Sequence, residues 1–273
     1  MIKDITLGQF FPGNSIVHRL DPRMKIILTV AYIVAIFLAK NLYSFALVTA
    51  SAIALVVMSG ISWKTILKSL KPLIFVLAFT TFFNLFWTTG DVLLVSFWKI
   101  NIYLEGVVFS LMMILRITSL LIGTTVLLTY TTSPIMLTDA LERLLAPLRK
   151  IKIPVHEFSM MMTIALRFIP TLVEETDKIM SAQKARGADF ESGSLVRRAK
   201  ALVPILIPLF ISAFRRADEL ATAMECRCYR GGDGRTRMTK LKLAARDFVS
   251  VAVMAFFIAA IVLLNALPCA IAL

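Results

Sequence analysis

Two short segments of the chain each end a helical pattern on a single arginine. The first is TDKIMSAQKARGA (176–188), which contains Arg186, and the second is ADELATAMECRCY (217–229), which contains Arg227. The two arginines are 41 residues apart, and at that offset the segments align without a gap. A guanidinium offers a planar fork of hydrogen-bond donors that fits a carboxylate or a set of carbonyls. The repeat therefore offers the chemistry needed to bind an acidic or carbonyl-lined groove.

In each copy, three shared positions fall on one face of a helix. An aliphatic residue, an alanine and the arginine follow one another at i, i+3 and i+7. These residues are Ile179, Ala182 and Arg186 in the first copy, and Leu220, Ala223 and Arg227 in the second. Such a stripe suits insertion into a groove, because alanine permits close approach and the aliphatic side chain adds buried area. Two copies suggest two similar grooves, for example on the two halves of a dimeric partner.

A simpler interpretation of each arginine is that it only ends its helix. Arginine near the carboxyl end of a helix interacts favourably with the helix dipole, and glycine commonly follows the last turn. One such ending needs no other explanation, whereas two endings that share a whole stripe favour docking. The residues by themselves leave both interpretations open.

The composition is that of a membrane protein. The chain has 273 residues, of which 58% are hydrophobic, and its mean hydropathy is +0.81, whereas soluble domains are about 45–50% apolar. A membrane span needs roughly 20 mostly apolar residues. Five stretches qualify, and they predict an all-α polytopic membrane protein: about 24–40, 42–60, 71–89, 106–130 and 247–267. Asp21 and Pro22 suit the start of the first helix, as its cap and first turn.

The cations predict the orientation of these spans. The chain carries 30 Lys and Arg against 17 Asp and Glu, and positive charge accumulates on the cytoplasmic side of membrane proteins. Most of the cations outside the spans lie before the first span, between the second and third, and in residues 131–246. The amino terminus and 131–246 are therefore predicted to be cytoplasmic, and the uncharged carboxyl-terminal tail to be outside. The predicted domains are 1–130 with four spans, 131–246, and 247–273 with the last span.

Residues 131–246 are too long to be a plain loop and must have structure of their own. An amphipathic helix is predicted from residue 133 to near Pro147. Two apolar runs, 158–173 and 201–214, contain prolines and are too short or too polar to span. They predict helices packed under or along the membrane.

Other candidate sites are weaker. Cys226 and Cys228 flank Arg227, but only His18 and His156 could join them, and neither is close in sequence. A thiolate pair alone does not make a tetrahedral metal site, so no metal and no other cofactor is predicted.

The sequence also lacks the glycine-rich phosphate loop that ends in Gly-Lys-Ser/Thr. No catalytic residue is predicted, and the chain is not expected to be an enzyme.

Arg116 lies in the middle of a predicted span, in MMILRITSLL. A charged residue at that depth is a functional candidate by default. The alternative is structural: Arg116 would bond Asn84, a serine or threonine, or backbone carbonyls of neighbouring helices. Both interpretations stay open at this point.

Taken together, these segments resemble the transmembrane T component of energy-coupling factor transporters over essentially the full length of the chain. The resemblance rests on GQFFPGNSIVHRLDPRMK (8–25), QKARGADF (183–190) and AMECRCYRGG (223–232). The family has an X-Arg-X pattern, often Ala-Arg-Gly, at the end of each of two cytoplasmic coupling helices. The first copy, Ala185-Arg186-Gly187, fits this pattern fully. The second, Cys226-Arg227-Cys228, keeps the arginine but has cysteine on both sides, and cysteine adopts the left-handed conformation less readily than glycine.

The resemblance implies a non-catalytic scaffold in the plasma membrane of a bacterium. Its coupling helices would hold two cytoplasmic ABC-type ATPases, and its membrane helices would hold a substrate-binding S component for uptake of a vitamin or metal ion. The basic cytoplasmic block lacks interleaved aromatic residues, so lipid headgroups and acidic protein grooves are expected partners and nucleic acid is not. The alternative is a stand-alone secondary transporter or channel. That class favours ionisable or helix-breaking features at mid-membrane in two matching halves, and only Arg116 fits.

Overall fold

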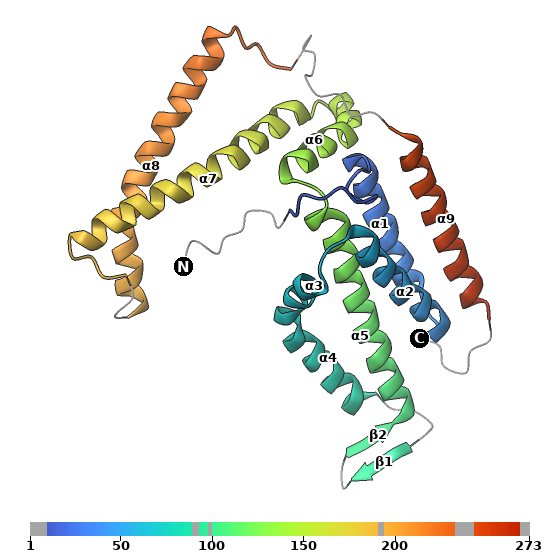
Figure 1. Cartoon of the computed structure of the whole chain (residues 1–273). Helices are drawn as coiled ribbons and strands as arrows, with labels where there is room; N and C mark the ends of the chain where they lie inside the picture. The colour runs from blue at the N-terminus through green and yellow to red at the C-terminus, as the bar shows by residue number, and fades with distance from the viewer. Residues whose placement is uncertain (1–9, 89–92, 98–99, 191–193, 233–242, 268–273) are drawn as a thin grey trace. The chain divides into compact units, whose positions relative to one another are not determined.

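The computed structural model describes residues 10–88, 93–97, 100–190, 194–232 and 243–267, and it confirms the all-α class (Figure 1). The helices are α1 (Pro22–Leu38), α2 (Leu42–Ser59), α3 (Trp63–Leu70), α4 (Ile74–Trp87), α5 (Leu104–Thr124), α6 (Pro134–Leu144), α7 (Val155–Ala185), α8 (Leu195–Cys226) and α9 (Ala245–Asn265). Short 3-10 or π segments are η2 (Lys71–Leu73), η3 (Thr125–Tyr130) and η4 (Ala146–Ile151). One antiparallel hairpin joins α4 to α5, formed by β1 (Leu93–Phe97) and β2 (Ile100–Tyr103).

The described residues form two compact units. Residues 8–137 and 240–273 make one, which we call the bundle unit, and residues 138–239 make the other, which we call the crossed-helix unit. Some of the sequence features lie outside the described residues, namely the extreme amino terminus, Asp91, Lys99 and the tail 268–273.

Four helices of the bundle unit are long and apolar enough to cross a membrane. They are Leu42–Ser59, Trp63–Trp87, Leu104–Tyr130 and Ala245–Asn265, and they confirm four of the five predicted spans. α1 has 17 residues, one fewer than the shortest of these. That length is at the lower end of what crosses a bilayer, so α1 as a span remains a prediction.

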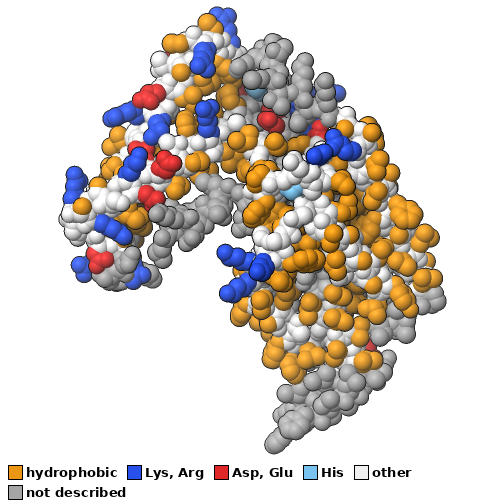
Figure 2. Space-filling view, viewed as in Figure 1, with side chains coloured by type: hydrophobic (Ala, Val, Ile, Leu, Met, Phe, Trp, Pro, Cys, Tyr) orange, Lys and Arg blue, Asp and Glu red, His pale blue; other side chains and the backbone are white. Residues whose placement is uncertain are grey.

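The third span differs from its prediction at its start. It begins at Trp63 rather than near residue 71, and it includes the 3-10 segment η2 around Pro72. Proline lacks the N–H that an α-helix interior needs, and the tighter turn accommodates it. Large apolar side chains of this span point outward: Phe75 is 78% exposed and Trp87 80%. Hydrophobic side chains cover most of the bundle unit on the face in Figure 2, as suits a lipid surrounding.

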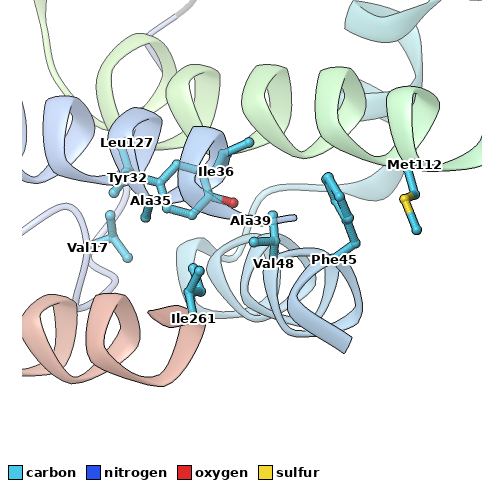
Figure 3. Packing of buried hydrophobic residues seen from close by; sticks show 10 residues of the cluster. All are labelled: Val17, Tyr32, Ala35, Ile36, Ala39, Phe45, Val48, Met112, Leu127 and Ile261. Atoms are coloured by element: carbon cyan, nitrogen blue, oxygen red, sulfur yellow. The ribbon is translucent and has the colours of Figure 1, made fainter. Parts of the chain in front are cut away.

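α1 is the central element of the bundle core. Tyr32 and Ile36 of α1 pack with Phe45 of α2, Leu127 of η3 and Ile261 of α9 (Figure 3). On the α5 side, a methyl group at Gly123 would overlap the Tyr32 ring. Glycine at this position therefore lets α5 approach α1 closely.

The first turn of α1 is capped as the sequence predicts. Asp21 is the N-cap, its Oδ1 accepts the Arg23 N–H at 2.9 Å, and Pro22 occupies the first helical position. The Arg23 guanidinium also pairs with the Asp21 carboxylate, with 2.8 Å between Nη2 and Oδ2. The cap thus satisfies a backbone donor that the helix itself leaves unpaired.

The start of α9 is tied to this cap by Asp247, which is 2% exposed. Its Oδ1 accepts the Asp21 N–H at 2.9 Å, and its Oδ2 accepts the Ala244 N–H at 2.8 Å. One buried carboxylate therefore accepts the backbone N–H groups of the N-cap residues of two different helices. Hydrogen bonds to a charged group are the strong ones, worth about 1.5–3 kcal/mol each.

The other end of α9 is tied to α1 and α2 in the same manner. Asn265 accepts the Lys40 N–H at 3.1 Å and the Ser44 hydroxyl at 2.7 Å, and its amide donates to the Leu38 carbonyl at 2.7 Å. In return, the Asn41 amide donates to carbonyls at the end of α9. Helix ends leave backbone groups without partners inside the helix, and these side chains supply partners and fix where the ends meet.

Lys25 is buried, at 1% exposure. Its ammonium caps the carboxyl end of the helix formed by α5 and η3. Nζ donates to the Thr131 carbonyl at 2.7 Å, to the Thr131 and Thr132 hydroxyls at 3.2 Å each, and to the His18 carbonyl at 3.3 Å. A cation at a helix carboxyl end is favourable. The position of Lys25 next to the first span suggests one of the cytoplasmic surface cations, but the structure places its side chain inside the bundle unit.

The crossed-helix unit contains two helices that are longer than predicted. α7 has 31 residues and α8 has 32. The predicted helices at 158–173 and 201–214 are parts of α7 and α8, which continue without a break to the two arginines. Prolines lie inside both helices: Pro170 in α7, and Pro204 and Pro208 in α8. The structure places neither among the described helices that could span a membrane. The predicted amphipathic helix, α6, ends at Leu144 before Pro147.

We expect Asp247→Ala to destabilise the bundle unit. The change leaves the Asp21 and Ala244 N–H groups without their acceptor, at a cost of about 1–3 kcal/mol for each buried donor. Thermal unfolding of the detergent-solubilised chain measures the effect. Asp218→Ala is the control, because Asp218 is exposed on α8. Equal melting temperatures for the two variants would contradict the role given to Asp247.

Candidate docking site at the ends of two crossed helices

The two arginines end the two long helices in the same way. Arg186 is the C-cap residue of α7, with φ −86° and ψ 7°, and Arg227 is the C-cap residue of α8, with φ −93° and ψ 14°. The side chains therefore leave their helices at equivalent positions with nearly the same backbone geometry.

The chain turns away from α7 through a Schellman motif, which closes a helix with a left-handed residue after the cap. Gly187 is that residue, with φ 87°. The Ala188 N–H donates to the Gln183 carbonyl at 3.0 Å, and the Gly187 N–H donates to the Lys184 carbonyl at 3.0 Å. A Cβ at position 187 would meet no other atom, so the preference for glycine there is conformational.

The same motif closes α8 without a glycine. Cys228 takes the left-handed position with φ 53°. The Tyr229 N–H donates to the Met224 carbonyl at 3.0 Å, and the Cys228 N–H donates to the Glu225 carbonyl at 2.8 Å. The substitution of cysteine for glycine therefore leaves the end geometry intact, although a residue with a Cβ adopts it at a cost of about 1–2 kcal/mol.

The two predicted stripes also have the same pattern of exposure. The aliphatic residue is half-buried in each copy, and the alanine and the arginine are exposed. The half-buried residues are Ile179 and Leu220, and the exposed ones are Ala182, Ala185, Arg186, Ala223, Cys226 and Arg227. Among the residues that the structure describes, neither arginine side chain has an ion-pair or hydrogen-bond partner within the chain. Both guanidinium groups are therefore available to a partner.

α7 and α8 cross each other (Figure 1). Glu175 Oε2 and Arg216 Nη2 lie 3.0 Å apart, and the two residues are separated by 41 positions, which is the offset of the repeat. The two helices therefore contact each other through equivalent positions of the repeat. Each arginine lies 11 residues beyond its own member of this pair, or about 16 Å at 1.5 Å per residue.

The crossing contact is electrostatically favourable. The Ser212 hydroxyl and the Arg216 guanidinium hold the pKa of Glu175 below its ordinary value. Glu175 is therefore ionised at neutral pH, and its contribution to stability is lost only as the pH falls through that lowered pKa. Sequence analysis missed this pair, although opposite charges at positions 41 residues apart were a readable signal.

Cys226 and Cys228 are exposed free thiols. Among the described residues, no three metal-ligating side chains come together. The two thiols flank Arg227, so the side chains next to the C-cap arginine of α8 differ from those next to the C-cap arginine of α7.

Arg116 bonds a backbone carbonyl of a neighbouring helix, which was one of the two open interpretations. Its Nη2 donates to the Ala39 carbonyl at 3.0 Å, and its guanidinium carbon lies 5.1 Å from the centre of the Phe45 ring. Ala39 is the C-cap residue of α1, so the cation lies at a helix carboxyl end and over an aromatic face, both of which favour it. Asn84 is not its partner.

The left-handed cysteine gives a direct test of the end geometry. We expect Cys228→Gly to stabilise the last turn of α8 by about 1 kcal/mol, because glycine adopts φ near +50° without a Cβ clash. Hydrogen exchange of the backbone amides of residues 227–229 measures this. Cys228→Ala is the matched control, since it removes the sulfur and keeps the Cβ. If the amides of residues 227–229 exchange at equal rates in the Cys228→Gly and Cys228→Ala variants, the left-handed conformation at position 228 carries no strain.

Arg116 should hold α1 and α5 together through its charge and its donors. Arg116→Leu leaves the Ala39 carbonyl without its donor, and we expect a loss of about 1–3 kcal/mol of stability. Arg116→Lys keeps a cation and should lose less. Thermal unfolding in detergent compares the two variants, and transport by the assembled complex reports on function. Equal behaviour of the two variants would show that the charge is dispensable.

Comparison with known proteins agrees with this geometry. Residues 13–239 match the family model CbiQ, described as cobalt transport protein. The chain is 53% identical over 265 residues to the energy-coupling factor transporter transmembrane protein EcfT of Ruminiclostridium cellulolyticum, covering 97% of this chain and 98% of that protein. It is 54% identical over 251 residues to EcfT of Clostridium kluyveri, covering 92% and 93%. EcfT of Bacillus subtilis is 46% identical over 247 residues, covering 90% and 93%.

The family match extends through both arginine ends and most of the bundle unit, and the relatives match the chain over nearly its whole length. The predicted resemblance is therefore confirmed. The chain belongs to the CbiQ family of transport proteins, alongside the energy-coupling factor transporter transmembrane proteins.

Proposed function

We propose that the chain is the non-catalytic transmembrane scaffold of an energy-coupling factor importer. Its crossed-helix unit holds two cytoplasmic ABC-type ATPases, and its bundle unit meets a membrane-embedded S component that binds the substrate, a vitamin or a metal ion. The printed names of its relatives support a place in such a transporter.

The observation that carries the proposal is the pair of like helix ends, each closed by the same motif with an exposed arginine at its C-cap. Most paired subunits associate about a two-fold axis, which presents the same patch twice. Two ATPases related in this way offer two like grooves. Arg186 and Arg227 each lie 11 residues beyond their own member of the Glu175–Arg216 ion pair, which suits such a pair of grooves.

The chemistry of each contact follows from the stripe. An exposed guanidinium inserted into a groove makes paired hydrogen bonds to a carboxylate or to carbonyls at a helix end. The exposed alanines Ala182 and Ala223 let the wall of the groove approach the helix backbone. A buried arginine makes the contact specific for the matching groove, because removing the arginine leaves its partner group desolvated and unpaired.

The two long helices transmit motion between the arginines and their crossing. When ATP closes the two ATPases, the grooves approach each other and both arginines follow. The crossing pair, Glu175 and Arg216, couples the two helices, so a change at one end is felt by the other. The chain supplies no phosphate-binding loop, so hydrolysis belongs to the partner chains.

The proposed orientation follows from the cations. The amino terminus and residues 131–246 lie in the cytoplasm and the carboxyl terminus lies outside, in the plasma membrane of a bacterium. A stand-alone secondary transporter is less well supported. Its main candidate residue, Arg116, is engaged by the Ala39 carbonyl and the Phe45 ring.

The test reverses both docking charges. We expect each single change, Arg186→Ala or Arg227→Ala, to reduce ATP-driven transport, because truncating one member of a buried charged pair costs about 2–5 kcal/mol at an interface. When one arginine is bound in its groove, the other is held at a high effective concentration near its own groove. The single variants should therefore retain the ATPases. The double variant, Arg186→Glu with Arg227→Glu, should lose them. Co-purification of the ATPases with the tagged chain is the measurement.

The matched control is Arg197→Glu with Arg198→Glu. It makes the same change in net charge at exposed residues in the first turn of α8, outside the two arginine ends. If the arginines were only helix caps, their removal would cost about 1 kcal/mol or less and leave binding intact. A folded double-Glu chain that keeps its ATPases and transports normally would refute the docking proposal.

A further inference from the structure

A groove of about 470 Å³ lies in the bundle unit between α1, α2 and α9. Ala54 and Met58 of α2 form one wall, and Val253 and Phe257 of α9 form the other. Tyr32 of α1 lies at its floor. Its lining is almost wholly apolar, and it opens outward, since Met58 is 47% exposed and Val253 62%.

The groove is about as long as one leaflet of a bilayer. Along α9 it runs from Arg246 to Phe257, which is about 16 Å at 1.5 Å per residue. The hydrocarbon core of a bilayer is about 30 Å thick, so one leaflet accounts for about 15 Å. The groove thus begins at the start of a membrane-spanning helix and ends near the middle of the membrane.

The only cation in the lining of the groove is at its headgroup end. Arg246 is exposed, and among the described residues its side chain has no hydrogen-bond or ion-pair partner. Its neighbour Asp247 is buried and accepts the backbone N–H groups of Asp21 and Ala244. The Arg246 charge is therefore not neutralised by that carboxylate through direct contact.

The chemistry of the groove decides between kinds of occupant. Water is a poor occupant because the lining is almost wholly apolar and gives it few hydrogen-bond partners. A single hydrocarbon chain suits the apolar walls, and the cation at one end suits an anionic headgroup attached to that chain.

We infer that this groove binds one acyl chain of an anionic glycerophospholipid, with the lipid phosphate against Arg246. Cations at the membrane surface attract anionic lipids, and the apolar groove continues inward from that cation. With the orientation proposed above, the lipid belongs to the cytoplasmic leaflet. The bound chain fills the gap between α2 and α9, and α9 needs that packing because only 11% of its spanning window is buried within the protein.

The test compares lipid retention by the assembled complex after purification in detergent. The complex is first reconstituted in vesicles of phosphatidylcholine with a minor fraction of phosphatidylglycerol, and native mass spectrometry then counts the lipids that remain bound. We expect wild type to retain one phosphatidylglycerol in preference to phosphatidylcholine. Val253→Trp and Ala54→Phe each fill the groove, and each should reduce that retained lipid at least about tenfold, as a loss of 1.4 kcal/mol or more would.

The matched control is Val262→Trp. It places the same substitution on the same helix, at a residue that is also more than half exposed and lies outside the groove. Arg246→Gln should keep a bound lipid but lose the preference for phosphatidylglycerol, whereas Arg197→Gln on α8 should keep that preference. Equal retention by Val253→Trp, Ala54→Phe and Val262→Trp would overturn the inference, as would loss of a co-purifying polypeptide instead of a lipid.

The outcome is independent of the docking proposal. The ATPases are counted in the same spectra, and the groove variants should retain them. Loss of the ATPases with unchanged lipid would therefore test the docking proposal for the arginine ends. Loss of lipid with unchanged ATPases would test the lipid inference for the groove alone.

Discussion

The first turn of α1 holds the chain at both points where it leaves and re-enters the bundle. Lys25 bonds Thr131 and Thr132, where the chain leaves after η3, and the Asp21 N–H bonds Asp247, where it returns into α9. The first and last turns of a helix leave backbone groups that need partners outside the helix. These two contacts supply such partners and hold together the points where the chain leaves and re-enters the bundle unit.

The segment that carries Arg186 and Arg227 leaves the bundle unit after Thr131–Thr132 and returns to it at Ala244–Asp247. Both of these points are hydrogen-bonded to the first turn of α1 or its cap. The buried charges at these points resist displacement, because separating a buried cation or carboxylate from its partners is costly.

Sequence patterns predicted the elements that depend on composition and period. Apolar length identified four of the spans, and the i, i+3, i+7 stripe identified both arginine ends. Features that depend on a distant neighbour could not be predicted. Nothing local distinguishes Lys25 from a surface cation, and nothing local selects the Ala39 carbonyl as the partner of Arg116. The apolar runs 158–173 and 201–214 predicted helices but not their full length. The long helices keep the remaining hydrogen bonds of their ladders and continue through Pro170, Pro204 and Pro208.

The two helix ends reach one geometry with different residues, and the difference is informative. Gly187 takes a left-handed conformation without strain, whereas Cys228 takes it against the preference of a side chain with a Cβ. Each end is closed by the same pair of backbone hydrogen bonds, so the motif does not depend on a glycine at the left-handed position. Those two bonds offset the cost of the Cβ at Cys228, and each arginine therefore leaves its helix from an equivalent backbone position.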